Sequence, residues 1–346
     1  MKRFVAPFEI REAPLRQYCE VVFAGHDHYK SIELQYLDIS DHRRGYVVLM
    51  NTHEGFLDVL SEPSLALDED WCRNDPSVSH YRLGRVETID LNDLRLETGV
   101  DGVNARVAFT DNAGRRIEMV VTSAPSGPAK SRNLFIPASP RPNVTMLWFL
   151  YVFEFAPLRP SDRIDIRIDG QPITPNKWPW PIGLRRYIQG RYANNIAFFS
   201  LNPPKAGPLP FIDEDDAFDL ASSPDAPTIR AWQKRQQNHD IEISFDPPIP
   251  AVPATGEAVQ GQGTFNLAVD KIALAKGQYQ LSSSDGRVDL TFTDVDQYWR
   301  PPQNDFSVWM LEFYHRLKTG RRRWHWKATT SYDDGKVSYD SAWTLR

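Results

Sequence analysis

The sequence predicts an all-β protein of two antiparallel β-barrel or β-sandwich units, joined by a proline-rich linker and containing at most short helices. Three observations predict this class. Proline accounts for 27 of the 346 residues, which exceeds the ordinary usage of about 5%. Aromatic residues make up 12% of the chain. Most apolar segments are short, alternate with polar residues and end at clusters of glycine or asparagine, as strands and turns do.

The first unit begins with a predicted hairpin. Residues 31–38 alternate apolar and polar side chains, residues 41–45 supply turn chemistry, and residues 46–50 return as a second strand. Further strands are expected at 86–96, 105–110, 116–122, 163–168 and 193–201. Glycine and asparagine separate several of them, and these residues adopt positive φ without strain. A meander of neighbouring antiparallel strands is therefore expected.

The composition changes between residues 202 and 256, where ten prolines and the acidic run at 213–216 occur. Such a composition is typical of a linker or a long surface excursion. Within it, residues 228–239 contain no proline or glycine and are predicted to form an exposed helix. The expected division is an N-terminal β-domain over 1–201, a proline-rich acidic linker with a short helix over 202–239, and a C-terminal β-barrel domain over 240–346.

The second unit is expected to consist of short strands. They are predicted at 240–245, 263–269, 271–281, 287–292, 307–317, 322–330 and 336–343. Seven strands at this spacing favour a sandwich or a closed barrel. Because Thr319 and Gly320 form a turn signal, the strand at 322–330 is expected to pair back on the strand at 307–317.

The charge balance and the apolar segments exclude several classes of partner. The formal net charge is −5, whereas binding a polyanion requires clustered lysine and arginine. The N-terminus has no apolar run of the about 7–15 residues found in a signal peptide. The most apolar segment, residues 146–155, is shorter than the about 20 residues that span a bilayer. We therefore expect a cytoplasmic protein with no nucleic-acid and no membrane partner, and leave the oligomeric state open.

Two apolar strands each carry a single carboxylate. Glu154 lies in Leu-Tyr-Val-Phe-Glu-Phe-Ala and Glu312 in Val-Trp-Met-Leu-Glu-Phe-Tyr-His, so both halves share the pattern apolar-apolar-Glu-Phe. A glutamate covered on both sides would have a raised pKa and could donate a proton near neutral pH. His315, on the apolar face of the second strand, is a third candidate acid. The alternatives are a solvent-facing or arginine-paired glutamate and a hydrogen-bonded core histidine.

Rigid aromatic side chains are the candidate ligand-binding residues. Trp178 and Trp180 lie in the loop Lys-Trp-Pro-Trp-Pro, where the prolines reduce the entropy that the rings lose on binding. This loop could stack on a sugar ring, cap an apolar cavity or plug the end of a barrel. The remaining ligand-binding candidates are Tyr187, Tyr192, Trp299, Trp309, Trp324 and Trp326.

Residues 321–327 are locally basic and alternate in character. The cations Arg323 and Lys327 are expected on one side of a strand, and Trp324 and Trp326 on the other. One interpretation is a stripe that binds nucleic acid. The other is a solvated strand face beside a turn, with the tryptophans in a core or cavity wall, and this second interpretation agrees with the overall charge.

A metal site is suggested by one histidine pair. His26 and His28 have the His-x-His spacing that places two imidazoles on one strand face, with Glu33 five residues on. The spacing is similar to the first motif of cupins, but the flanking glycines and a second histidine motif are missing. We expect no metal and no cofactor. The motifs of common serine hydrolases, nucleotide-binding loops and zinc proteases are also missing from the sequence.

Over about residues 20–345, the chain resembles the two-domain lipocalin-like superfamily in the order of its strands, in its tryptophan and tyrosine residues and in its isolated glutamate and histidine groups. This superfamily includes carotenoid 1,2-hydratase-type and AttH-type proteins and some cofactor-free pericyclases. Residues 94–122 and the two Glu-Phe strands carry the resemblance best, and no catalytic residue of the family matches a position here. The resemblance implies an apolar ligand, such as an isoprenoid or polyketide, that is held in a cavity without metal or nucleotide.

The first functional hypothesis is therefore a protein that binds a largely apolar small molecule in a β-barrel or inter-domain pocket. If it is an enzyme, it is a cofactor-independent lyase or isomerase, a hydratase or cyclase that uses general acid catalysis by Glu154, Glu312 or His315. The second is a carbohydrate-binding or carbohydrate-processing β-sandwich with Trp178 and Trp180 as platforms. The third is a non-enzymatic interaction module, which would expose a large apolar patch.

Overall fold

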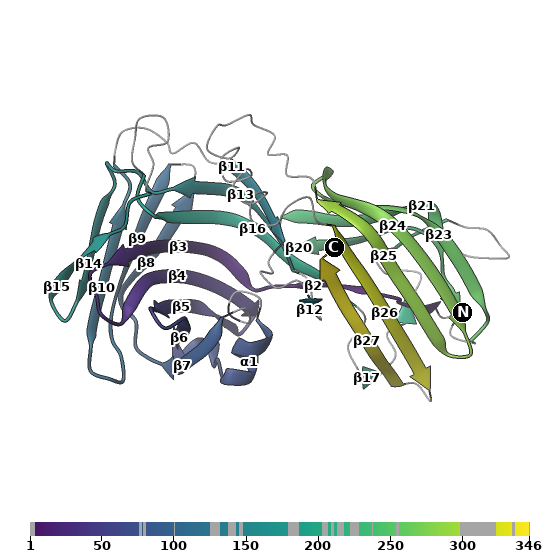
Figure 1. The fold of residues 1–346 in the computed structure, drawn as a ribbon, viewed down its shortest axis with the longest axis horizontal. Helices are drawn as coiled ribbons and strands as arrows, with labels where there is room; N and C mark the ends of the chain where they lie inside the picture. Colours follow the sequence, from purple (N-terminus) through teal and green to yellow (C-terminus); the bar gives the residue numbers. More distant parts are fainter. Residues whose placement is uncertain are drawn as a thin grey trace.

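Strands arranged in two lobes make up most of the described chain (Figure 1). The computed structural model describes residues 4–75, 78, 81–99, 101–124, 132–137, 143–144, 148–178, 187–202, 207–208, 211–212, 218–221, 228–236, 238–253, 256–297, 323–333 and 336–345. Within these residues the helices are α1 (Glu69–Asn74) and the 3-10 turn η1 (Pro63–Leu65). The predicted all-β class is confirmed. No helix in these ranges has the length and apolar character needed to cross a membrane.

A branched sheet forms the N-terminal lobe. Its main path runs through β7 (Arg82–Thr88), β6 (Phe56–Ser61), β5 (Arg43–Thr52), β4 (Tyr29–Ser40), β3 (Leu15–Ala24), β15 (Gln171–Pro175), β14 (Arg163–Ile168), β10 (Arg116–Thr122), β9 (Gly102–Thr110) and β8 (Asn92–Gly99). Off this path lie β16 (Gly190–Asn202), β13 (Trp148–Pro157), β11 (Arg132–Pro137) and β2 (Glu9–Glu12). The predicted hairpin is confirmed, because β4 and β5 pair in antiparallel register.

A second large sheet forms the C-terminal lobe. Its order is β12 (Asn143–Val144), β27 (Lys336–Leu345), β26 (Trp324–Asp333), β25 (Arg287–Gln297), β24 (Ile272–Ser284), β23 (Val259–Val269), β21 (His239–Pro250), β20 (Thr228–Gln236) and β19 (Phe218–Ala221), with β17 (Gly207–Pro208) beside β27. A small sheet orders β18 (Phe211–Ile212), β1 (Phe4–Val5) and β22 (Val252–Pro253).

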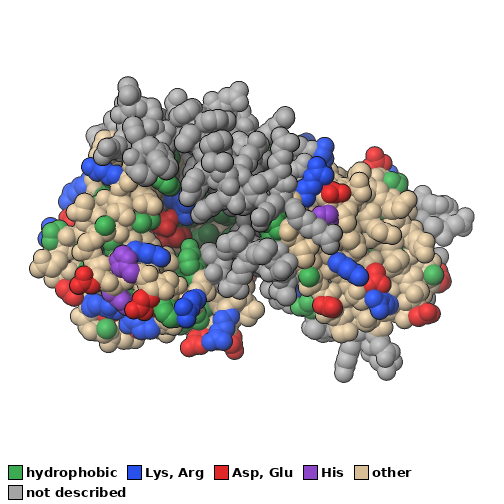
Figure 2. All heavy atoms as spheres, viewed as in Figure 1, with side chains coloured by type: hydrophobic (Ala, Val, Ile, Leu, Met, Phe, Trp, Pro, Cys, Tyr) green, Lys and Arg blue, Asp and Glu red, His purple; other side chains and the backbone are tan. Residues whose placement is uncertain are grey.

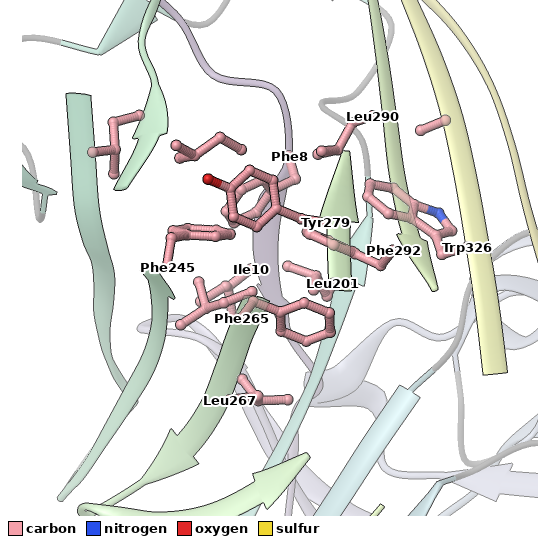
Figure 3. Close-up of a cluster of buried hydrophobic side chains, with 14 of the residues drawn as sticks. Phe8, Ile10, Leu201, Phe245, Phe265, Leu267, Tyr279, Leu290, Phe292 and Trp326 are labelled. Carbon is pink, nitrogen blue, oxygen red and sulfur yellow. The ribbon is translucent and has the colours of Figure 1, made fainter. Parts of the chain in front are cut away.

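The N-terminal segment belongs to the core of the C-terminal lobe. Phe8 is 1% exposed, and its ring centroid lies 5.9 Å from those of Phe245 and Phe292. Phe8, Ile10 and Leu201 of β16 lie among the side chains of the C-terminal sheet (Figure 3). The start of the chain also lies in that lobe (Figure 1). The domain boundaries at 201 and 239 stay predictions.

This packing corrects the expected barrel. Among the described strand pairs, none closes either large sheet on itself. The apolar side of the curved C-terminal sheet is covered instead by Phe8 from the N-terminal segment and by Phe199 from β16. Because these residues remove the apolar surface from water, closure of the sheet is not needed to bury it.

The sheet of the N-terminal lobe is buried on both faces. Cys19 and Val21 on β3 face one apolar cluster, which includes residues of β8, β9, β10 and β14. Tyr18 and its register neighbour Ala193 on β16 face a second cluster, which includes Leu65 of η1 and Cys72 of α1. We call this second side the α1 face. Successive side chains of a strand point to opposite faces. The even-numbered residues of β3 from Tyr18 onward, which include Glu20, therefore lie on the α1 face.

Three sequence expectations are wrong. Residues 228–236 form strand β20 and not a helix, because they pair with β21 and bury Ile229 and Ala231, and such tertiary pairing overrides local propensity. Residues 86–96 are divided between β7 and β8, which pair with different strands. The expected partner strand at 307–317 lies outside the described residues, and both edges of β26 are already paired, with β25 and β27.

Candidate functional site

Three charged side chains form a row across neighbouring strands on the α1 face. Glu20 of β3 is the register partner of Glu33 on β4 and of Arg191 on β16. Side chains directly opposite in antiparallel strands have Cβ atoms about 4.5–5.5 Å apart and share one face. The strand register therefore brings two carboxylates and one guanidinium together.

Arg191 pairs with one carboxylate of this row. Its Nη2 lies 2.9 Å from Glu20 Oε2, and the Glu20 carboxylate is the main cause that raises the pKa of Arg191. The other carboxylate, Glu33, has a neutral donor: Gln35 Nε2 donates a hydrogen bond of 2.7 Å to Glu33 Oε1. The two glutamates thus differ in how well their negative charge is compensated.

The surroundings of Glu33 favour its protonated form. Burial raises its pKa, and the neighbouring Glu20 charge raises it further, to about 7, against the opposing effects of Gln35 and Arg191. A carboxyl group with a pKa near the working pH can both donate and accept a proton. Glu33 is therefore the strongest acid–base candidate among the described residues.

Two tyrosines complete the group. Tyr18 is 6% exposed, and the guanidinium carbon of Arg191 lies 6.0 Å from its ring centroid. Tyr81 is 38% exposed, and burial, Glu33 and Glu20 raise its pKa to about 12. Its hydroxyl is therefore a hydrogen-bond donor at neutral pH. We call Tyr18, Glu20, Glu33, Gln35, Tyr81 and Arg191 the carboxylate cluster.

Solvent reaches part of this cluster. The Arg191 side chain is 50% exposed, whereas that of Glu20 is 13% exposed. Figure 2 shows acidic, basic and hydrophobic side chains of the N-terminal lobe next to one another on this side of the molecule. The cluster therefore combines partial desolvation of Glu20 with exposure of Arg191 to solvent.

A second ionic network ties strands of the same lobe together. Tyr29 Oη accepts hydrogen bonds of 2.8 Å from Arg85 Nη2 and from Arg115 Nη2, and donates one of 3.1 Å to Asp58 Oδ2. Arg85 pairs with Asp58 at 2.7 Å, and Arg115 pairs with Asp111 at 2.6 Å. Because its buried carboxylates have arginine partners, we assign this network a structural role.

Glu154 lies away from the carboxylate cluster. Asn194 Nδ2 donates a hydrogen bond of 3.1 Å to Glu154 Oε2, and Gln17 Nε2 donates one of 3.0 Å to Asn194 Oδ1. Gln17 and Tyr18 are consecutive on β3 and so point to opposite faces. The carboxylate also approaches β8, since Glu154 Oε2 lies 3.9 Å from the position of a Cβ on Gly99. Its catalytic role stays a prediction.

The aromatic ligand-binding candidates are spread over several places. The backbone N–H of Trp178 donates to the carbonyl of Tyr187 at 3.0 Å, and both side chains are half-buried. Tyr192 is 2% exposed in the core of the N-terminal lobe. Trp324 and Trp326 are 3% and 0% exposed in the core of the C-terminal lobe. The candidates Trp180, Trp299, Trp309, Glu312 and His315 lie outside the described residues.

His26 and His28 organise a turn. His26 Nδ1 accepts hydrogen bonds from the backbone N–H groups of His28 and Tyr29, at 3.1 and 2.9 Å. Glu33, the third residue considered with them, belongs to the carboxylate cluster. Across the part of the chain that the structure describes, no three His, Cys, Asp or Glu side chains are arranged to hold a metal ion.

Glu20 and Glu33 were not among the predicted site residues, although the sequence around them contains a recognisable signal. Glu20 lies in Tyr-Cys-Glu-Val-Val-Phe, which is a carboxylate in an apolar strand, as for Glu154. Glu33 lies in the alternating strand of the predicted hairpin. Their juxtaposition depends on the register of β3 on β4 and of β16 on β3, which neither strand reveals by itself.

Comparisons with protein-family models, curated proteins and solved structures found no match for the chain. The resemblance to the two-domain lipocalin-like superfamily therefore stays a prediction.

Proposed function

We propose that the protein is a cofactor-independent isomerase or lyase that binds a largely apolar small molecule at the carboxylate cluster and moves a proton on it. The observation that carries the proposal is the Glu20–Glu33 pair, in which Arg191 pairs with Glu20. Two adjacent carboxylates in different surroundings take different proton-transfer roles in many active sites. Glu33 is the acid–base group in this proposal.

The cluster supplies the groups that proton abstraction beside a carbonyl requires. The carboxylate form of Glu33 takes a proton from carbon, and the electron pair of the broken C–H bond moves onto the carbonyl oxygen. The hydroxyl of Tyr81 and the exposed part of Arg191 are the donors that stabilise this oxygen. Return of the proton from Glu33 to another carbon completes an isomerisation. Expulsion of a leaving group instead gives elimination.

The apolar character of the ligand is inferred from the packing around the cluster. Tyr18 belongs to the apolar cluster of the α1 face, together with Leu49 and Val59. A ligand that displaces water from these groups strengthens every charge interaction beside it. Glu33, already partly desolvated, would respond to such a ligand with a further shift of its pKa in the same direction.

The experiment follows exchange of solvent deuterium into bound ligands. Purified protein is incubated in D₂O with a panel of apolar ketones, enones and isoprenoids, and mass spectrometry measures deuterium in each compound. We expect exchange into at least one of them, and we expect Glu33→Gln to abolish it while the compound still quenches tyrosine or tryptophan fluorescence on binding.

Glu97→Gln is the matched control. The Glu97 side chain lies on β8, a different strand from that of Glu33, is 61% exposed and pairs with Arg95 of the same strand. This variant should leave exchange unchanged. Equal exchange by the parent and by Glu33→Gln would exclude Glu33 as the acid–base group. Absence of both binding and exchange over the whole panel would contradict the proposed ligand class.

A further inference from the structure

A pocket of about 510 Å³ lies in the C-terminal lobe, on β21, β23, β24 and β25. It is in a different lobe from the carboxylate cluster. Phe245 and Phe265 at its base belong to the apolar core, whereas its polar lining residues alternate with the core-facing ones along the same strands. The pocket is therefore on the outer face of the sheet, and its size is in the range of about 300–1,000 Å³ found for ligand sites.

Two irregularities in strand pairing border this pocket. The register of β24 on β25 shifts between Lys276 and Gln278, and that of β25 on β26 shifts between Phe292 and Val295. At Gly277, a Cβ would lie 2.6 Å from the carbonyl oxygen of Thr293 and 2.9 Å from a ring atom of Phe265. Bulges of this kind bend a strand and change the direction of its side chains. They therefore explain why this part of the sheet is concave and forms a pocket.

Polar side chains cross the pocket in two parallel rows. Register pairs place Asn266 between Ser244 and Lys276, and Thr264 between Asp246 and Gln278. Neighbouring rows on one face are about 7 Å apart along a strand, and neighbouring strands are about 4.8 Å apart. A hydroxyl, a carboxylate and amides therefore lie within reach of one small ligand, and most of these side chains are exposed.

The charges that line the pocket cancel. Two acidic side chains, Asp246 and Asp294, face two basic ones, Lys276 and Arg323, and Arg323 Nη1 lies 3.4 Å from Asp294 Oδ1. A ligand of high net charge would gain attraction from one pair and repulsion from the other. A neutral ligand with many donors and acceptors matches this lining better, because hydroxyl, amide and carboxylate groups together offer both kinds of partner.

We propose that this pocket binds a neutral, hydroxyl-rich ligand of the saccharide class. The adjacent hydroxyls of a sugar act as donors to the carboxylate of Asp246 and as partners in both directions to the amides of Asn266 and Gln278. This site does not depend on the function proposed for the carboxylate cluster.

The test is saturation-transfer NMR of the full chain with glucose, galactose and maltose, beside glycine betaine and inorganic phosphate. We expect a neutral sugar to bind. Gln278→Trp, which fills the pocket, should weaken this binding about tenfold or more, equal to about 1.4 kcal/mol. Gln280→Trp is the matched control, since Gln280 is exposed two residues further along the same strand and does not line the pocket.

Three results would overturn the proposal. They are the absence of transfer to every sugar, transfer to betaine or phosphate alone, and equal weakening by Gln278→Trp and Gln280→Trp. Near-ultraviolet circular dichroism checks that both variants fold. If Gln278→Trp does not fold, Gln278→Ala takes its place, and a change in sugar affinity no greater than that of Gln280→Ala would then contradict the site.

Discussion

Glu20 and Glu33 face each other across the antiparallel pair β3–β4, and Arg191 pairs with Glu20 at 2.9 Å. Glu33 has the amide of Gln35 as its hydrogen-bond donor. Burial raises the pKa of Glu33, and the neighbouring Glu20 carboxylate raises it further, because two adjacent negative charges repel each other. Arg191 opposes this effect, since its positive charge lowers the pKa of Glu33.

Replacement of Glu33 by glutamine is expected to stabilise the protein at alkaline pH. The pKa of Glu33 is raised in the folded state from 4.5 to about 7. Stability due to this group is therefore full below pH 4.5 and is lost as pH rises through about 7. At pH 8, Glu33→Gln removes the cost of a buried charge, and its free energy of unfolding should exceed that of the parent. Urea unfolding at pH 5 and pH 8 measures the difference, and Glu97→Gln should show none.

Replacement of Arg191 by methionine is expected to raise the pKa of Glu33 further. The positive charge of Arg191 lowers this pKa in the parent, and its loss also leaves Glu20 without its ion-pair partner. The carboxyl carbon of Glu33, labelled with ¹³C, should titrate at higher pH in Arg191→Met than in the parent. The exposed pair of Arg167 and Asp165 provides a control variant, Arg167→Met, that should leave the titration unchanged. A downward shift in Arg191→Met would contradict the arrangement.

Replacement of His239 by alanine is expected to weaken the junction of the two lobes. His239 is buried, with 3% of the residue exposed. Its Nδ1 lies 2.8 Å from Asp270 Oδ2, and its Nε2 lies 2.8 Å from Asn195 Oδ1 on β16. Loss of the ring removes its hydrogen bonds to Asn195 and Asp270, although Asp270 Oδ1 still accepts one from the backbone N–H of Asp240. Each lost hydrogen bond costs about 0.5–1.5 kcal/mol. Urea unfolding measures the loss, and the exposed His42→Ala should change stability by less than about 0.5 kcal/mol.

Replacement of Phe8 by alanine is expected to destabilise the C-terminal lobe, although Phe8 lies at the start of the chain. Its ring centroid is 4.3 Å from that of Trp232. Truncation of a buried phenylalanine costs about 3–5 kcal/mol. Tryptophan fluorescence during urea unfolding reports the effect. A loss of less than about 1 kcal/mol would mean that the N-terminal segment is not part of this core.

The sequence was sufficient for the fold class and for most strands, because alternation of apolar and polar residues is a local signal. The hairpin of residues 31–38 and 46–50 is found as β4 and β5. The position of Phe8 in the other lobe could not be predicted, since it results from contacts between distant segments. Residues 228–236 were misassigned for the same reason, because pairing with β21 and not local propensity determines their conformation.

The carboxylate cluster could not be predicted from the sequence. The pattern of a carboxylate in an apolar strand selected Glu154, whose catalytic role stays a prediction. Burial raises the pKa of Glu33, and the second carboxylate, Glu20, which lies opposite it, raises it further. Such a neighbour becomes apparent only when the register of β3 and β4 is known, and a shift by one residue would place Glu20 and Glu33 on opposite faces.

The proton affinity of Glu33 is the property on which the proposed function depends most. Carbon-13 NMR titration of glutamate carboxyl groups, with Glu33→Gln to assign the signal, measures it directly. We expect a midpoint of about 7 for Glu33, well above the range of an exposed glutamate, about 4.3. A midpoint between about 4 and 5 would contradict an acid–base role for this residue at neutral pH.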